Sequence, residues 1–146
     1  MNAPQSVCNY AILRFLPYPD SGEFVNVGVV VGCMQPCFLH FLMEDSRMPA
    51  RVKAFFPEQS EEKFVAAQKA MQEEFKRLES MVNQFRDPIS CQRTFHEVVR
   101  PRESLFRFSE PRTILTSDPG NLSEQLFDRY VRMKEVLTEP QLAATA

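Results

Sequence analysis

The chain of 146 residues contains no tryptophan, only four glycines and two histidines, and no excess of positive charge. With so few glycines it has neither a Walker loop nor a kinase glycine-rich loop, which excludes a kinase or NTPase of a known kind. Its longest apolar run, Val27 to Met34, is far shorter than the ~20 residues of a membrane span. The formal net charge of −2 excludes a protein that binds nucleic acid over its whole surface.

The N-terminus also lacks the features of a signal peptide, because Met1 to Ser6 has no basic residue and no apolar run follows directly. We therefore predict a cytoplasmic protein with reduced cysteines. Cys33, Cys37 and His40 have a spacing close to that of zinc ligands, but no fourth ligand is near in sequence. Apolar thiols in a strand are the favoured interpretation, so neither a metal nor a cofactor is predicted.

Short strands with turns between them dominate the first third of the chain. Residues 8–17 are rich in Tyr, Ile, Leu and Phe, and the turn formers of YPDSGE follow them. Residues 22–32 and 37–43 form a second and a third predicted strand, separated at Gln35-Pro36. Such short connections favour antiparallel pairing, since parallel strands need long crossovers.

Helical periodicity dominates the middle and the end of the chain. Apolar residues recur every three or four positions from Phe64 to Phe85, which predicts a long helix that ends near Arg86, ahead of Pro88. A second helix is predicted over 122–137. The segment 44–59 is interpreted as a loop with a short helical turn, 89–104 stays ambiguous, and 105–116 predicts one or two short strands.

Together these elements predict an α+β fold. The expected architecture is a mostly antiparallel sheet of three to five strands, with one long helix and a C-terminal helix packed on it. We expect a single domain over 7–137 and flexible termini at 1–6 and 138–146.

The stretch GEFVNVGVVVG, Gly22 to Gly32, places polar and small residues inside a valine strand. Strict alternation would put Val25, Val27, Val29 and Val31 on a core face, with Asn26, Gly28 and Gly32 on the other. The favoured explanation is that a helix packs closely against the glycines, or that Gly28 lies in a bulge, while Asn26 bonds backbone groups. The alternative is a ligand or partner that docks there, with Asn26 as its polar contact.

YAILRFLPYPDSGEFVNVGVVV resembles the opening of a bacterial family, the domain-of-unknown-function family 3037 (DUF3037). LRFSEPRTILTSDP and the later LFDRYV resemble the second half of that family, so the likeness runs from Tyr10 to about Val131. The family carries no established activity. Its members stand beside genes for kinases of the HipA toxin type, which implies a companion role. The residues that the resemblance highlights are Arg14, Glu23, Asn26, Gly28, Arg107, Ser109 and Arg112.

Arginines are concentrated late in the chain. Arg107 and Arg112 flank a turn and are candidates for a forked clamp on a carboxylate, a phosphate or nucleic acid. The alternative, which we favour, is that such arginines are solvated or salt-bridged. Arg14 and Glu23, on either side of the first turn, are expected to form a structural ion pair. Cys91 with His96 is a candidate catalytic dyad that the sequence does not favour.

These observations favour a non-enzymatic interaction module with a protein partner, for which the resemblance suggests a HipA-type kinase. The sequence predicts no catalytic residue. A protein that binds nucleic acid or another anion through the arginines is the alternative. A hydrolase or nuclease is less favoured, because it requires Glu23, Asn26, Arg107 and Arg112 to converge on one pocket.

Overall fold

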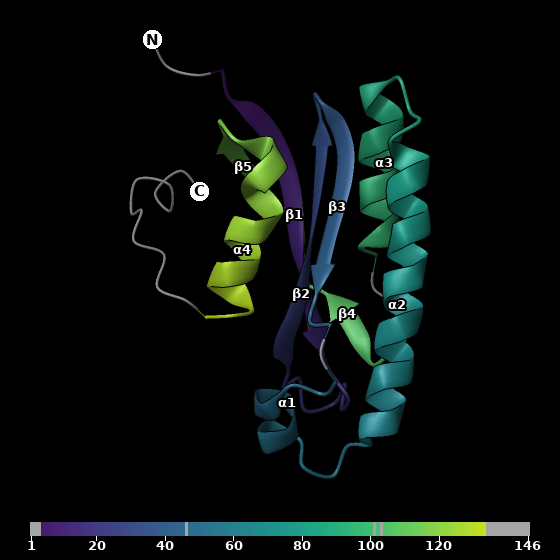
Figure 1. Ribbon diagram of the computed structural model, residues 1–146, viewed down its shortest axis with the longest axis vertical. Helices are drawn as coiled ribbons and strands as arrows, with labels where there is room; N and C mark the ends of the chain where they lie inside the picture. Colours follow the sequence, from purple (N-terminus) through teal and green to yellow (C-terminus); the bar gives the residue numbers. More distant parts are fainter. Residues whose placement is uncertain (1–3, 46, 101, 103, 134–146) are drawn as a thin grey trace.

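The structure is a computed structural model that describes residues 4–45, 47–100, 102 and 104–133. It is built around a five-stranded antiparallel sheet (Figure 1). This confirms the predicted α+β class. The strands are β1 (Ser6–Phe15), β2 (Val25–Met34), β3 (Cys37–Met43), β4 (Phe106–Phe108) and β5 (Arg112–Thr116). β1 is central: β2 and then β3 follow on one side, while β4 and β5 both pair with its other side. The predicted flexible ends lie largely outside the described residues.

Helices cover both faces of the sheet (Figure 1). One face carries α1 (Ala50–Phe55), α2 (Glu61–Val82) and α3 (Pro88–Val98). The other carries α4 (Leu122–Tyr130), which follows a short 3-10 turn. The prediction of a helix over 122–137 is wrong for residues 131–133, which are not helical; its remainder, from 134 on, lies outside the described residues. Within the described part of the chain, no helix is long and apolar enough to cross a membrane.

N-terminal caps explain where α2 and α3 begin. The Ser60 hydroxyl accepts a hydrogen bond from the Lys63 amide at 3.2 Å, and Glu61 and Glu62 follow in the first turn, where the helix dipole favours negative charge. The Asp87 carboxylate accepts from the Ser90 amide at 3.0 Å, with proline as the first helical residue. Of the segment 89–104 that the sequence left ambiguous, residues up to Val98 are therefore a capped helix.

A bulge in β2 changes which valines share a face. Leu13 lies opposite Gly28 and Arg14 opposite Asn26, so Val27 is an extra residue without a partner. The expectation that all four alternate valines share one face is wrong for this reason. Val29 and Val31 pack under α4, whereas Val27 packs with Phe15 on the α1 and α2 side.

Close packing requires glycine at both positions, but only Gly32 faces a helix, as the favoured interpretation held; Gly28 faces a neighbouring strand and lies beside the bulged residue Val27. A Cβ atom on Gly32 would lie 2.7 Å from the ring of Phe95 in α3. One on Gly28 would lie 2.8 Å from the backbone oxygen of Leu42. The surface that a ligand would have occupied over Gly32 is filled by the α3 side chain.

The structure joins Cys37 of β3 to Cys91 of α3 by a disulfide, with the two Cα atoms 6.2 Å apart. The prediction that all four cysteines are reduced is wrong for this pair, because the fold brings together residues that are 54 positions apart. Cys8 and Cys33 are free, buried, and opposite each other on β1 and β2. Since disulfides are rare in the cytosol, the cytoplasmic location stays a prediction.

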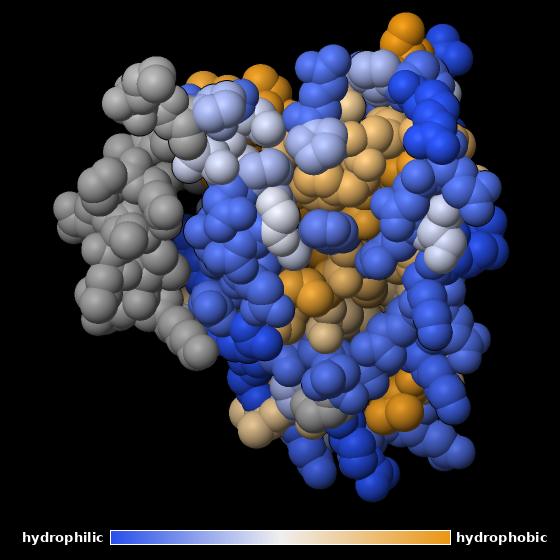
Figure 2. Space-filling view, turned by 45° about the horizontal axis from the view of Figure 1, so that its top comes forward, coloured by the Kyte–Doolittle hydropathy of each residue, from blue (hydrophilic) through white to orange (hydrophobic). Residues whose placement is uncertain are grey.

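β3 forms one edge of the sheet, and Figure 2 shows apolar surface in this region between hydrophilic helical ridges. An open edge exposes backbone groups to which another strand can pair. Here the Glu79 carboxylate of α2 accepts a hydrogen bond from the Phe41 amide at 2.9 Å. The helix therefore satisfies one donor of the edge and makes continuous strand addition less favourable.

Replacing Gly32 with alanine should destabilise the protein by about 1–3 kcal/mol, because the new methyl group overlaps the Phe95 ring. Adding Phe95→Leu should recover part of that loss, since the smaller side chain leaves room. Gly120→Ala is the control, as no atom of the described chain beyond its two sequence neighbours lies within 4 Å of its Cβ position. Urea unfolding of the wild type, Gly32→Ala, Phe95→Leu and the double variant measures this coupling, beside the Gly120→Ala control. Strictly additive losses from Gly32→Ala and Phe95→Leu would contradict it.

Candidate anion-binding site

Three of the residues highlighted by the sequence form one row across the sheet. Arg14 in β1 lies directly opposite Asn26 in β2 on one side and directly opposite Arg107 in β4 on the other. Directly opposite residues of antiparallel strands point to the same face, with Cβ atoms about 5 Å apart. The row follows Tyr10 and Ile12 along β1, so it lies on the α4 face of the sheet.

Arg14 is the centre of the row and is only partly satisfied. Its guanidinium carbon lies 4.1 Å from the centre of the Phe24 ring, a cation–π contact. Its Nε atom is buried and has no hydrogen-bond partner among the described residues. Burial, and secondly the charge of Arg112, lowers the pKa of Arg14 below its usual value. A bound anion would relieve both effects.

Arg112 adds a third positive charge from β5, where it lies opposite Tyr10. Burial, followed by the nearby Tyr130 hydroxyl, raises the pKa of Tyr10 to about 12, while Arg112 acts in the opposite direction. The phenol therefore stays neutral at physiological pH and can donate a hydrogen bond. Arg112 is exposed, so it stands at the solvent side of the cluster.

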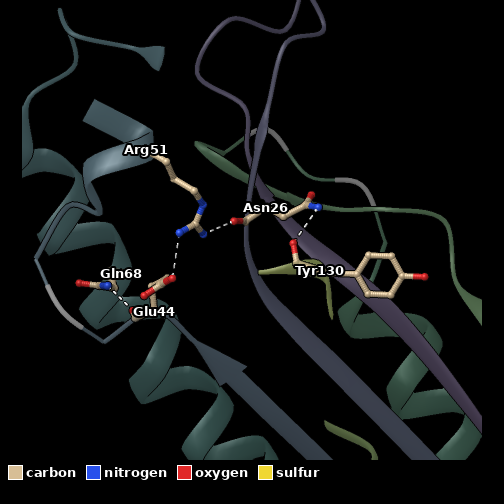
Figure 3. Close-up of polar contacts among 5 residues, drawn as sticks. All are labelled: Asn26, Glu44, Arg51, Gln68 and Tyr130. Carbon is tan, nitrogen blue, oxygen red and sulfur yellow. Dashed lines mark hydrogen bonds and ion pairs between the residues drawn. The ribbon is translucent and has the colours of Figure 1, made fainter. Parts of the chain in front are cut away.

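Asn26 is held in place from both sides of the sheet (Figure 3). Its side-chain Nδ2 atom donates to the backbone carbonyl oxygen of Tyr130 at 3.2 Å. Its backbone carbonyl oxygen accepts a hydrogen bond from Arg51 at 2.6 Å. Arg51 also pairs with Glu44 at 3.1 Å, and the Gln68 amide of α2 donates to the Glu44 carbonyl. The Asn26 Oδ1 atom is buried without a hydrogen-bond partner.

Unpaired buried atoms are therefore concentrated in the row. Arg14 Nε, Arg107 Nε and Asn26 Oδ1 are the buried side-chain atoms without a partner in the described part of the chain. Two are donors on cations and one is a neutral acceptor. Buried polar atoms normally have a partner, because an unmet one costs about 1–3 kcal/mol. The arrangement suits a group that accepts from the arginines and donates to Asn26, as a hydrogen phosphate does.

In the described part of the chain, no carboxylate pairs with the arginines of the cluster, Arg14, Arg107 and Arg112. The expected ion pair of Arg14 with Glu23 is thus wrong: Glu23 is exposed, and its backbone amide donates a hydrogen bond to the Ser21 hydroxyl. Glu23 does not join the residues with which the enzyme hypothesis grouped it.

Gly28 and Ser109, also highlighted by the sequence, have contacts that explain them structurally. Gly28 lies beside the bulge. The Ser109 hydroxyl accepts from the Ile12 amide at 2.8 Å, and the Ser109 amide donates to the Ile12 carbonyl at 2.8 Å. Ser109 thereby continues the pairing of β1 beyond β4 and keeps Arg107 in register.

The other chemical candidates are separated or occupied. Cys37 and Cys91 are bonded to each other, so neither is available as a zinc ligand or as the nucleophile of a dyad with His96. His40 stacks on Phe38 with ring centres 4.3 Å apart. Among the described residues, no group of three His, Cys, Asp or Glu side chains could hold a metal ion.

Sequence reasoning missed four neighbours of the row: Tyr10, Phe24, Arg51 and Tyr130. Tyr10 and Phe24 lie within the segments that carry the family resemblance, but they were interpreted as strand residues. Arg51 belongs to a segment interpreted as a loop. Nothing in the local sequence connects Tyr130 to Asn26, since only the packing of α4 brings them together.

A family model described as protein of unknown function, DUF3037, matches residues 10–131. The chain belongs to that family. This confirms the resemblance, and the match includes the whole row together with Arg112 and Tyr130. Comparison of the chain with curated proteins and with solved structures finds no match. Membership in DUF3037 assigns no chemistry, so the chemistry must be argued from the site.

Arg51→Met should destabilise the protein by about 1–2 kcal/mol, because it leaves the Asn26 carbonyl oxygen and the Glu44 carboxylate without their charged donor. Arg47→Met is the matched control. Arg47 pairs with Glu61 at 3.0 Å but is 82% exposed, so its loss should change stability by less than about 0.5 kcal/mol. Urea unfolding compares the two variants, and equal losses would show that Arg51 does not support the row.

Proposed function

We propose that the protein is a non-enzymatic binding module that recognises an anionic group on a partner protein through Arg14, Arg107 and Arg112. The observation that supports this most directly is the pair of buried arginine Nε atoms that, among the described residues, have neither a hydrogen-bond partner nor a paired carboxylate. Arginine suits carboxylate and phosphate groups because its planar donors form two parallel bonds to them. Asn26, fixed by Arg51 and Tyr130, supplies a neutral acceptor beside the cations.

A protein partner is favoured over nucleic acid by the distribution of charge. Three arginines in one cluster suit one or two anionic groups. A protein that binds a nucleic-acid strand instead has an extended basic surface along the strand's backbone. The chain carries a net charge of −2, so its overall field repels a polyanion. The partner that the family resemblance suggests is a HipA-type kinase, and the proposed location is the cytoplasm.

Inorganic phosphate should stabilise the wild-type protein more than chloride of equal ionic strength does. With a dissociation constant of about 1 mM, 10 mM phosphate would add about 1.4 kcal/mol. That corresponds to a rise of about 3–6 °C in the midpoint of thermal unfolding. Arg14→Met should lose this rise while its own stability is unchanged or higher, because the variant removes a partly buried charge that Arg112 repels.

Arg86→Met is the control for a lost positive charge, since Arg86 is exposed and distant in sequence from the row. It should keep the full response to phosphate. An equal response in wild type, Arg14→Met and Arg107→Met would mean that phosphate acts elsewhere, and would contradict the anion site.

The partner proposal is tested by capture from the native host. The tagged protein should retain a protein in stoichiometric amount, identified by mass spectrometry, that is released as salt is raised in steps. Arg14→Met with Arg112→Ala should reduce the captured amount at least tenfold, and Arg86→Ala should not. Retention that is identical in all three proteins, or capture of nucleic acid alone, would refute a partner bound through these arginines.

A further inference from the structure

A second site lies on the opposite face of the sheet, in a groove bounded by α2, α3 and β4. The cavity has a volume of about 800 Å³. Its apolar lining includes Phe75 and Leu78 of α2, Val98 of α3 and Phe106 of β4. Small-molecule sites in proteins have volumes of about 300–1,000 Å³ and are lined mainly by apolar side chains with a few polar groups.

The groove exists because α3 is half as long as α2. The two helices share a core with β1 and β2 through Phe75, Leu78 and Phe95. Beyond Val98 the chain leaves α3, and α2 continues over β4 without a helical neighbour (Figure 1). Met71 and Phe108 are only partly buried there, so an apolar ligand would remove existing apolar surface from water.

Charged residues around the groove are mostly positive. Of the described residues that line it, five are arginines and two are glutamates. Both glutamates are already paired within their own helices, Glu74 with Arg77 at 2.7 Å and Glu97 with Arg100 at 3.1 Å. Arg93 and Arg102 form no ion pair among the described residues. Arg107 lines the groove from β4, but its side chain points to the other face, beside Arg14. A positive wall above an apolar floor, in a chain of net negative charge, is complementary to a ligand with an apolar body and an anionic group.

We propose that this groove binds a small amphipathic anion: an acyl chain, or an apolar body of similar size, that carries a carboxylate or phosphate. Its apolar part lies between Met71, Phe75 and Phe106, and its anionic group pairs with Arg93 or Arg102. This site is separate from the arginine row and does not depend on the proposed partner.

The volume of the cavity favours a small molecule over a whole helix from a partner protein as the occupant. A three-turn helix with its side chains is roughly 11 Å across and about 16 Å long, which is on the order of 1,500 Å³. That exceeds the cavity, so a helix could insert only one ridge of side chains. The volume of about 800 Å³ is instead within the range of small-molecule sites.

Dodecanoate is the probe, titrated into the full-length protein by isothermal calorimetry below its micelle concentration. Dodecylammonium, with the same chain and the opposite charge, is the matched ligand. We expect one dodecanoate per chain, bound at least tenfold more tightly than dodecylammonium. Arg93→Gln with Arg102→Gln should reduce the affinity for dodecanoate about tenfold and abolish the preference between the two ligands.

Two tryptophan variants locate the site. Ala70→Trp places an indole on a residue that lines the groove and should weaken binding at least tenfold. Ala66→Trp is its control, because Ala66 is exposed on the same helix and does not line the groove. Far-ultraviolet circular dichroism checks that both variants fold. Arg14→Met should bind dodecanoate as wild type does, which distinguishes this site from the arginine row.

Any of three results would overturn the proposal. The first is that dodecanoate shows no saturable binding below 1 mM, a dissociation constant that corresponds to a binding free energy of about −4 kcal/mol. The others are equal affinity for dodecanoate and dodecylammonium, or equal effects of the two tryptophan variants. Failure of dodecanoate together with binding of an acidic amphipathic peptide that Ala70→Trp blocks would also overturn it, and would assign the groove to a helix of a partner protein.

Discussion

The bulge at Val27 is the constraint on which both the sheet and the row of arginines depend. Side chains of a strand alternate with a period of two, so one extra residue exchanges the faces of everything before it. Because of the bulge, Val27 packs on the face of the sheet that α1 and α2 cover, and Asn26 lies opposite Arg14. Gly28 makes this possible, because a side chain there would meet the Leu42 carbonyl oxygen of β3.

Arg14 and Arg107 are partly buried cations whose Nε donors have no partner among the described residues, which destabilises the fold. Other contacts must therefore offset this cost. Each unmet polar atom costs about 1–3 kcal/mol, in a protein class whose net stability is only about 5–15 kcal/mol. Phe24 stacks on Arg14, and Tyr130 and Arg51 fix Asn26. These contacts position the row but do not neutralise it. A fold that violates local rules at one place and satisfies them elsewhere is typical of a functional site.

Periodicity in the sequence predicted the elements that bury one clear stripe or face. The α2 stripe and the third strand were located within a few residues, and the glycines of β2 were assigned to close packing. Pairings between distant segments were not accessible. The ion pair proposed for Arg14 relied on closeness in sequence to Glu23, whereas the sheet places Arg107 opposite Arg14. The disulfide between Cys37 and Cys91 was missed because it depends on where α3 packs.

The three residues of β4 separate the two sites and contribute to both. Phe106 and Phe108 point to the helices, where they pack in the core and line the groove. Arg107, between them, points to the other face and completes the row with Arg14. Its position is therefore fixed by the burial of its two neighbours and by strand pairing, not by an ion pair. A cation held by apolar packing alone keeps its charge available, and that is the property an anion-binding surface requires.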